Sequence, residues 1–439
     1  MTVLLDVASA AAGPEAAGPE AATPLAVPAD AARTPVPVKP VLMKGNEAMA
    51  EAAIQAGCDA YFGYPITPQA ELLEWMARRM PELGRVFVQA ESEVAAINMA
   101  LGAAATGSRV LVTSSSPGIS LMAEGMSYLA ASEVPVVLIN VMRGGPGLGS
   151  IGPSQSDYFQ ATKGHGHGDY RVPVFAPSSI AEAVDLVAES FAVAERYRTP
   201  VMILADGVMG QVMEPVVPVY RMPPRVEGGW ELTGANGRPQ RIVRSLHLRP
   251  EDLEAHNLAL QQKYQTITQH EVRWASERLE DAEIVIVAYG TAARVARTAI
   301  ERARAQGLRV GMFRPITLWP FPTAELAAIA PRVRAFVVVE LSSGQMVEDV
   351  RLAIEGRAPV FFHGRTGGMV PTPGQVVDAV RSAWATTAPA GHVTPFPIDD
   401  ADEPNPLSLI EAGAWAELGW PGPEPDFDSE LDPLQLVYR

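Results

Sequence analysis

From about residue 41 onward, the hydrophobic positions of this chain fall into short continuous runs that alternate with helical patterns. Continuous runs rich in Val and Ile are typical of strands buried on both faces of a sheet. Six such runs precede residue 206, at 59–64, 85–89, 109–113, 134–141, 172–176 and 200–205. The pattern predicts an α/β fold built on a doubly wound parallel sheet, in which ligands bind at the carboxyl ends of the strands.

A second, smaller alternating unit follows a break in the pattern. Prolines cluster between about 216 and 230, and a polar segment with a helical pattern runs from 250 to about 279. Further buried strand patterns occupy 283–290, 308–313, 335–340 and 360–362. We therefore expect a first domain at 41–215, a linker containing a helix at 216–275, and a second α/β domain at 276–384.

The two ends of the chain have a different composition. Residues 1–40 contain Ala-Ala-Gly-Pro-Glu twice in tandem and almost no aromatic side chains, and residues 385–439 are rich in proline and acidic side chains. Such segments bury too little apolar surface to offset the entropy of ordering. We expect a disordered N-terminal arm and an extended C-terminal tail that is disordered or lies on a partner.

The overall composition narrows the class of protein. With 48% hydrophobic residues the chain is globular, and a net charge of −16 without a basic run argues against a nucleic-acid surface. The start lacks the basic and apolar regions of a signal peptide, and no apolar run is long enough to span a membrane, so we expect a cytoplasmic protein. The single cysteine, Cys58, cannot hold an iron–sulfur cluster alone, so any cluster must sit on another chain.

Glu93 is the leading candidate for a catalytic residue. It opens an alanine-rich segment in which Ile97, Ala100, Leu101 and Ala104 follow at steps of three and four, so a helix would place Glu93 on the inward face. A carboxyl group there is expensive to keep charged, which favours a protonated form that donates a hydrogen bond. The alternative is an acidic residue that only complements the positive end of the helix dipole.

Two loops that follow predicted strands carry further candidates. In Gly63–Pro68 two prolines fix the backbone and Thr67 offers a hydroxyl group, although Thr67 has the alternative role of a helix cap. The run 113–120 leads into a helix with small residues that let a ligand approach backbone amides, and a bare turn with capping serines is equally consistent with it.

A third loop, 143–152, follows the strand pattern at 134–141. Arg143 is placed to grip a carboxylate with two parallel hydrogen bonds, or to form a structural ion pair at the surface. Residues 147–152 match the dinucleotide fingerprint formally, but Pro146 and Pro153 bracket the glycines and no acidic residue ends a strand at the required distance. We therefore do not expect nucleotide binding there.

Two weaker patterns point to metals. Asp206–Gly207 with Asn236 has the residue types that hold the metal of a bound diphosphate, but the proline-rich interval between them is not the required helix and strand. His165 and His167 lie among glycines without a third nearby ligand. The sequence predicts no metal site in this chain.

Taken together, the loop Gly63–Pro68, Glu93 with its helix, the run 113–118 and the string Arg143-Gly-Gly-Pro resemble the alpha subunit of the 2-oxoacid:ferredoxin oxidoreductases. The longer strings 142–149, 153–164 and 167–171 are similar to the branched-chain type, which acts on 2-oxoisovalerate. The resemblance covers about residues 41–372. It implies a pyrimidine-binding domain of the thiamine diphosphate fold at 41–215 and a transketolase C-terminal-like domain at 276–384.

The resemblance also implies the chemistry and the partners. Glu93 matches the catalytic glutamate that bonds the cofactor's aminopyrimidine, Thr67 and Arg143 match substrate-binding residues, and Pro65, Ser116 and Gly118 fall at cofactor-binding positions. Such enzymes decarboxylate a 2-oxoacid oxidatively to an acyl-coenzyme A and pass the electrons to ferredoxin. The diphosphate and its magnesium would sit on a beta subunit and the iron–sulfur clusters on partner chains, with small gamma and ferredoxin-like delta subunits in a dimer of hetero-oligomers.

Several alternatives stay open at this point. The same chemistry could act on pyruvate, 2-oxoglutarate or an aryl 2-oxoacid, although apolar loop residues such as Ile66 and Leu148 favour an aliphatic side chain. A nicotinamide-dependent dehydrogenase and a non-catalytic scaffold are more remote readings. If activity depends on a partner that carries an iron–sulfur cluster, the ferredoxin-linked reaction is favoured over the nicotinamide-dependent dehydrogenase.

Overall fold

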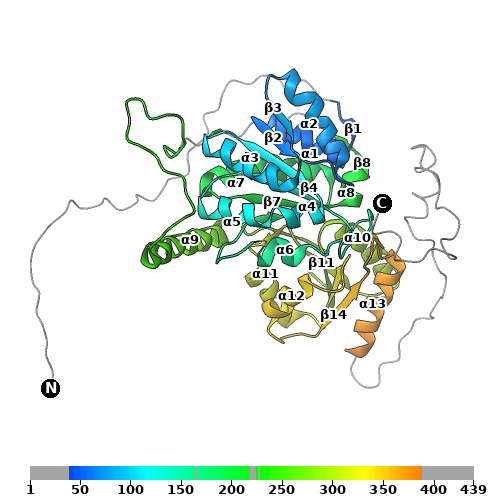
Figure 1. The fold of residues 1–439 in the computed structure, drawn as a ribbon. Helices are drawn as coiled ribbons and strands as arrows, with labels where there is room; N and C mark the ends of the chain where they lie inside the picture. Colours follow the sequence, from blue (N-terminus) through cyan, green and yellow to red (C-terminus); the bar gives the residue numbers. More distant parts are fainter. Residues whose placement is uncertain (1–38, 165, 218–223, 226–227, 388–439) are drawn as a thin grey trace, which may run out of the picture. The chain divides into compact units, whose positions relative to one another are not determined.

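The computed structural model describes residues 39–164, 166–217, 224–225 and 228–387. Its largest sheet has seven strands in the order β12-β6-β7-β5-β4-β2-β3 (Figure 1). All neighbouring pairs in it are parallel except β12 with β6. The elements of this first half are β1 (Val41–Lys44), α1 (Gly45–Gln55), β2 (Ala60–Gly63), α2 (Ala70–Glu82), β3 (Val86–Gln89), α3 (Glu93–Ala105), β4 (Val110–Ser114), α4 (Ser116–Leu121), α5 (Ala123–Ala131), β5 (Val137–Met142), α6 (Tyr158–Lys163), β6 (Val174–Phe175), α7 (Ile180–Tyr197), β7 (Val201–Asp206), α8 (Gly207–Gln211) and β8 (Met213–Val216).

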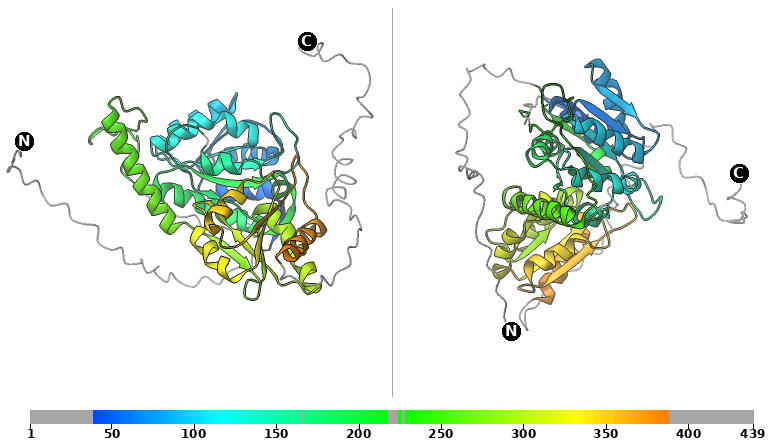
Figure 2. Two further views of the ribbon diagram at one scale, coloured as in Figure 1. Left: turned by 90° about the horizontal axis from the view of Figure 1, so that it is seen from below. Right: turned by 60° about the vertical axis from the view of Figure 1, so that its left-hand side comes forward.

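Helices cover both faces of this sheet (Figure 2), because its central strands are apolar on both sides. On β4, Val110 and Val112 pack into a cluster with α3, α4 and α5, whereas Leu111 between them packs into a second cluster with α1, α2 and α7. Successive side chains of a strand point to opposite faces, so a continuous apolar run fills both layers. This confirms the doubly wound parallel sheet predicted from the sequence.

The second unit is a five-stranded sheet in the order β14-β13-β10-β11-β9, drawn in green to orange in Figure 1. Its strands are parallel except for β9, which runs antiparallel to β11. The elements of this half are α9 (Pro250–His270), β9 (Trp274–Glu277), β10 (Ile284–Val287), α10 (Gly290–Ala305), β11 (Val310–Pro315), β12 (Thr317–Trp319), α11 (Thr323–Ile329), a 3-10 turn (Ala330–Arg332), β13 (Ala335–Glu340), α12 (Met346–Ile354), β14 (Val360–Gly364) and α13 (Pro373–Thr386).

Two features differ from the division expected from the sequence. The connector helix α9 ends at His270 rather than near Leu279, because residues 274–277 form the edge strand β9 instead. The short strand β12 lies between two elements of the second unit along the chain, yet it pairs with β6 of the first sheet. The second half of the chain therefore completes the first sheet.

Gln155 joins the loop after β5 to the second sheet. Its backbone N–H donates to the Leu341 carbonyl at 2.8 Å, its side-chain oxygen accepts from the Leu341 N–H at 3.0 Å, and its Nε2 donates to the Tyr289 carbonyl at 2.9 Å. The side chain is fully buried, so these bonds satisfy polar groups that would otherwise be costly to bury. They fix the loop that carries the candidate site against the second unit.

The predicted arm (1–40) and tail (385–439) fall almost wholly outside the described residues, as does His165. Within the described part of the chain, no helix combines the length and the apolar character needed to cross a bilayer.

Candidate functional site

The strand order places a topological switch between β2 and β4. From β2 the chain passes outward to β3 on one side, and then returns to β4 on the other side of β2. At such a point the loops leaving the carboxyl ends of the two strands diverge and open a crevice that binds ligands. The candidate residues lie on the loops around this crevice, after β2, β3, β4 and β5.

Glu93 begins α3 and is buried, with 5% of its surface exposed. Ser92 caps the helix by accepting from the N–H of Ala95 at 3.2 Å. A Cβ atom built on Gly118 would lie 2.4 Å from Oε1 of Glu93, so the backbone of α4 runs directly against this carboxyl group. No hydrogen bond to the carboxyl group is recorded among the described residues. Glu93 is therefore buried, and its carboxyl group has no hydrogen-bond partner in the described part of the chain.

The unpartnered hydroxyl group of Ser114 lies close to Glu93, and that of Ser115 follows it in the chain. The side-chain oxygens of Ser114 and Ser115, at the end of β4, are buried without a hydrogen-bond partner in the described structure. The Cβ position built on Gly118 lies 2.0 Å from the Ser114 oxygen, which places that oxygen and Glu93 against the same glycine. Buried polar groups without partners are rare in native proteins, and a bound ligand or water is one way in which they are satisfied.

The loop after β2 presents Pro65 and Thr67 at the surface of the crevice, and both are exposed. Thr67 does not cap α2, since that helix begins at Ala70 with Gln69 at its N-cap position. Gln69 instead anchors the loop, because its side-chain oxygen accepts from the Thr113 hydroxyl at 2.7 Å and its nitrogen donates to the Tyr64 carbonyl at 3.3 Å. The hydroxyl of Thr67 has no recorded partner among the described residues.

Arg143 follows directly after β5 and is 8% exposed. Its two terminal nitrogens donate to the carbonyls of Thr67 at 3.0 Å and Leu148 at 3.1 Å, and its Nε is buried without a partner. Within the described part of the chain no acidic group forms an ion pair with it, which rules out the structural ion pair considered above. A buried guanidinium held only by neutral carbonyls attracts an anion.

The glycine-rich loop after Arg143 is not a dinucleotide site. Arg143 and Pro153 form an isolated antiparallel bridge, and the Gly144 N–H donates to the Gly152 carbonyl at 2.9 Å, so the loop closes on itself. The next helix, α6, starts only at Tyr158, whereas the fingerprint needs its glycines to open a helix. The structure supports the rejection of nucleotide binding here.

Ser116 and Gly118 lie on α4, and Ser116 lines a cavity of about 580 Å³ that residues of the glycine-rich loop and of the second unit also line. The Ser116 hydroxyl is already engaged, since it donates to Oδ2 of Asp157 at 2.6 Å and accepts from the Arg143 N–H at 3.0 Å. Burial raises the pKa of the Asp157 carboxyl group, and hydrogen bonds from Ser116 and Asn140 oppose that shift. Asp157, Asn140 and Gln69 are not predicted from the sequence, because nothing in the local pattern distinguishes them from ordinary polar loop and strand residues.

No resident metal site is evident. In the described residues there is no group of three His, Cys, Asp or Glu side chains placed to hold an ion. Asp206 caps α8 by accepting from the N–H groups of Val208 and Met209, and it also accepts from the Thr291 hydroxyl at 2.8 Å. The carboxyl group of Asp206 accepts hydrogen bonds from α8 and α10, so its oxygens are already used within the chain and are not available to the metal of a diphosphate.

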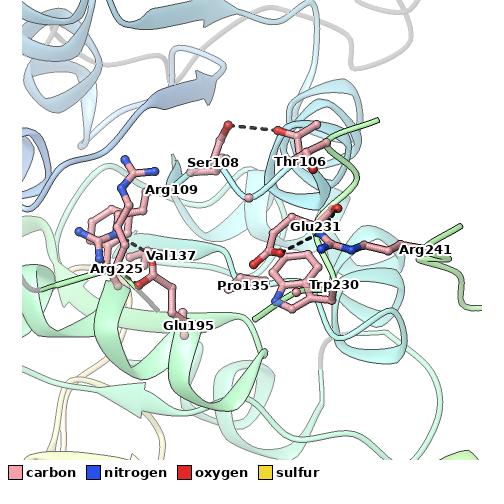
Figure 3. Close-up of a pocket in the computed structure, with 16 residues that line it drawn as sticks. Thr106, Ser108, Arg109, Pro135, Val137, Glu195, Arg225, Trp230, Glu231 and Arg241 are labelled. Carbon is pink, nitrogen blue, oxygen red and sulfur yellow. Dashed lines mark hydrogen bonds and ion pairs between the residues drawn. The ribbon is translucent and has the colours of Figure 1, made fainter. Parts of the chain in front are cut away.

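A second cavity of about 400 Å³ lies at the opposite edge, where β4 and β5 begin (Figure 3). Arg109 is buried there and pairs with both carboxylate oxygens of Glu195, at 2.6 and 2.9 Å. Arg225 pairs with both oxygens of Asp59 in the same way, at 2.6 and 2.7 Å. Because these charges neutralise one another, this cavity lacks the unused polar groups found at the carboxyl edge.

Comparison with known proteins identifies two family regions. Residues 51–232 match the family described as pyruvate flavodoxin/ferredoxin oxidoreductase, thiamine diphosphate binding. Residues 282–376 match pyruvate:ferredoxin oxidoreductase core domain II. The first region contains every candidate residue described above.

Two curated relatives come from Methanothermobacter thermautotrophicus. The chain is 49% identical to a ketoisovalerate oxidoreductase subunit, VorB, over 341 residues that cover 77% of this chain and 97% of that protein. It is 36% identical to a 2-oxoglutarate synthase subunit, KorA, over 366 residues, with 77% and 97% covered.

Two solved structures resemble the fold. A 2-oxoglutarate:ferredoxin oxidoreductase from Magnetococcus marinus, with 2-oxoglutarate, coenzyme A and succinyl-CoA bound, matches with a TM-score of 0.72 and 28% identity, over 79% of this chain and 66% of that chain. A split gene transketolase matches with a TM-score of 0.53 at 16% identity, over 79% of this chain and 99% of that one, which supports the fold alone. Since the chain also shares 49% identity with a relative of which it covers 97%, it belongs to the 2-oxoacid:ferredoxin oxidoreductase family.

Proposed function

We propose that this chain is the alpha subunit of a thiamine diphosphate-dependent enzyme that converts 2-oxoisovalerate oxidatively to its acyl-coenzyme A and carbon dioxide, with ferredoxin as electron acceptor. The observation that carries the proposal is the buried, unpartnered carboxyl group of Glu93 against Gly118 at the switch point of the sheet. The 49% identity to a ketoisovalerate oxidoreductase subunit supports the choice of reaction.

The crevice fits the pyrimidine end of thiamine diphosphate. A Cβ atom at position 118 would clash with Glu93 and with the unpartnered hydroxyl of Ser114, so glycine keeps this position clear of a side chain beside two unused polar groups. Glu93, Gly118, Ser116 and Pro65 would hold the ring. When bound, the cofactor supplies a nucleophilic carbon and a sink for the electrons released by decarboxylation. The carboxyl group of Glu93 would hydrogen-bond the ring and so assist acid–base chemistry on it.

Arg143 and Thr67 are the residues that we assign to the 2-oxoacid. The guanidinium presents five N–H donors and uses two of them on backbone carbonyls, so donors stay available for a carboxylate. The same hydrogen bond from Arg143 to the Thr67 carbonyl ties the two residues together, which sets their spacing before substrate arrives. Preorganised donors of this kind bind and orient an anion without the free-energy cost of rearranging the site on binding.

The rest of the machinery is assigned to partner chains. Asp206 is committed to capping α8, so we propose that a beta subunit binds the diphosphate and its magnesium. Cys58 is buried, and burial with the neighbouring Asp59 raises the pKa of its thiol to about 12, which disfavours the thiolate that a cluster needs. We therefore place the clusters on gamma and delta subunits, or on domains equivalent to them, in a dimer of hetero-oligomers that delivers electrons to ferredoxin.

The experiment that tests the function is reduction of a low-potential dye by the natively purified complex. Coenzyme A is supplied, and 2-oxoisovalerate, pyruvate, 2-oxoglutarate and an aryl 2-oxoacid are offered in parallel. We expect the highest kcat/KM with 2-oxoisovalerate. A preference for 2-oxoglutarate, the substrate named for the relatives at 36% identity, would overturn the substrate but keep the reaction. No reduction with any 2-oxoacid, in a complex that contains thiamine diphosphate and iron, would overturn the reaction itself.

A further inference from the structure

Arg143 is held through its backbone as well as through its side chain. The strand β5 ends at Met142, so the peptide groups of Arg143 lie beyond the ladder that β5 forms with β7. The Ser116 hydroxyl takes the place of a neighbouring strand: the Arg143 N–H donates to it at 3.0 Å, and it lies 3.3 Å from the Arg143 carbonyl oxygen. A single side chain of α4 therefore fixes where the backbone leaves the sheet.

The direction of this contact depends on Asp157. A serine hydroxyl has one proton to donate, and Oδ2 of Asp157, at 2.6 Å, is a closer acceptor than the Arg143 carbonyl oxygen. The amide of Asn140, on β5, donates to the same Oδ2 at 2.9 Å. The hydrogen bonds form a closed loop from β5 through Asp157 and Ser116 back to the residue that follows β5.

A carboxylate is an expensive acceptor at this position. Asp157 lines the 580 Å³ cavity, and no cation pairs with it in the described part of the chain. Both hydrogen bonds reach one oxygen, so the single carbonyl oxygen of an asparagine would accept them at a lower cost of burial. What asparagine lacks is charge, and a charged acceptor polarises the Ser116 hydroxyl and strengthens the bond that this hydroxyl accepts from Arg143.

We propose that Asp157 and Ser116 are positioning residues for Arg143, and that the charge of Asp157 tightens the grip of Ser116 on the Arg143 backbone so that the guanidinium is held ready for the substrate carboxylate. The identity of that ligand rests on the proposed function. The hydrogen-bond loop does not rest on it, because the loop exists in the ligand-free chain.

Three variants of the full complex test the proposal. Asp157→Ala removes the acceptor, whereas Asp157→Asn keeps an acceptor oxygen and removes only the charge. Asp349→Asn is the matched control, because Asp349 accepts from Tyr158 at 2.6 Å and pairs with Lys163 on α6, the helix that Asp157 precedes, without touching Ser116. We expect KM for the 2-oxoacid to rise on the order of tenfold in Asp157→Ala and about threefold in Asp157→Asn, and to stay unchanged in the control.

The division between kcat and KM distinguishes positioning from a general loss of structure. Since Asp157 contacts neither Glu93 nor the guanidinium, and reaches the candidate cofactor site only through the Ser116 hydroxyl, kcat at saturating 2-oxoacid should stay within about twofold of the parent. A uniform fall in kcat with an unchanged KM would overturn the proposal, as would an equal rise of KM in Asp349→Asn.

A second readout does not depend on turnover. Hydrogen exchange is followed by mass spectrometry on overlapping peptides that begin at or before residue 140 and cover Arg143, so that the Arg143 N–H, which donates to Ser116, keeps its label and is reported. We expect this amide to exchange on the order of tenfold faster in Asp157→Ala than in the parent or in Asp349→Asn. Unchanged exchange in Asp157→Ala would overturn the proposal even if KM rose. If the parent complex binds no 2-oxoacid, the proposed function fails, and the exchange measurement still decides the role of Asp157.

Discussion

A buried arginine lies at each end of the strands of the seven-stranded sheet, Arg109 at the amino ends and Arg143 at the carboxyl ends. The two arginines differ in the groups that surround them. Arg109, at the amino edge, pairs with both oxygens of Glu195 and donates to the carbonyls of Ala56 and Pro224, so its donors are taken by the chain itself (Figure 3). Arg143, at the carboxyl edge, meets only neutral carbonyls and keeps an unpartnered Nε.

The difference separates a structural cation from a binding one. A buried charge is stable only when it is paired. The ion pair with Glu195 stabilises the buried charge of Arg109 and joins distant segments of the chain. The charge of Arg143 is left for a ligand to neutralise. Burial of an arginine therefore carries no functional information until its partners are known. Three pairs of variants and one further variant, at Asp157, test this contrast.

The largest effect is expected from the acidic residues of the two edges. Glu93→Gln should cut turnover by about 10²–10⁴-fold, because an amide cannot serve as a general acid or base in the role proposed for this buried carboxyl group. Glu195→Gln, at the amino edge, should leave turnover per folded complex intact while lowering thermal stability. Steady-state kinetics and a melting curve on each complex check the pair, and normal turnover in Glu93→Gln would remove Glu93 from the mechanism.

The two arginines should separate stability from binding. Arg109→Ala leaves Glu195 buried without its partner and should lower the free energy of unfolding by about 3–5 kcal/mol. Arg143→Ala breaks only bonds to carbonyls and should cost about 1 kcal/mol, while raising KM for the 2-oxoacid strongly. Denaturant unfolding and KM measured side by side test this. The contrast fails if Arg143→Ala destabilises the chain as much as Arg109→Ala does.

Two glycines give a smaller and more local effect. Gly118→Ala would put a Cβ atom 2.4 Å from Oε1 of Glu93, and the clash should weaken thiamine diphosphate binding by about tenfold. Gly102, on α3, has nothing within 4 Å of its Cβ position, so Gly102→Ala should stabilise the helix by about 0.5–1 kcal/mol. Cofactor titration by calorimetry compares the two, and equal affinity in both variants would mean that Gly118 does not shape the site.

The smallest effect is the pH dependence of stability at Asp157. Burial raises the pKa of its carboxyl group in the folded chain, so the folded state keeps this proton at a pH where the unfolded state has released it. The contribution of Asp157 to the free energy of unfolding is therefore fully present below the pKa of an aspartate in the unfolded chain, near 3.9. It is lost as the pH rises through the higher pKa of Asp157 in the folded chain.

Asp157→Asn has no such loss. The Tm of Asp157→Asn minus the Tm of the parent should increase as the pH rises above about 4 and then level off. The total increase in this difference should be on the order of 1–2 °C. Melting curves of both complexes between pH 4.5 and 8 measure it. A Tm difference that shrinks as the pH rises would show that Asp157 stabilises the fold as an anion.

Much of the architecture was predictable from the sequence. The ten apolar runs became β2 to β7, β10, β11, β13 and β14, because burial on both faces of a parallel strand leaves a continuous local pattern. The strands β3 and β14 were expected to be buried but are partly exposed, since each lies at the edge of its sheet. The helix beginning at Glu93 was predictable for the same reason, since Ile97, Ala100 and Ala104 repeat at helical spacing and are buried. The short strands β1, β8, β9 and β12 were not predicted, because they are brief or partly exposed and their pairing decides that they are strands at all.

The partners of the polar residues were decided only by the tertiary structure. Arg109 and Glu195 are 86 positions apart, and Ser116 lies 27 positions from Arg143 and 41 from Asp157. No periodicity links such residues, since hydrogen bonds between loops depend on how the strands are ordered and on which loops that order brings together. The sequence alone determined which segments are buried and that Glu93 stands at the head of a helix. Only folding decided that Arg143 lacks a counter-charge and that Arg109 has one, because charge pairing is a property of positions in space and not of neighbours along the chain.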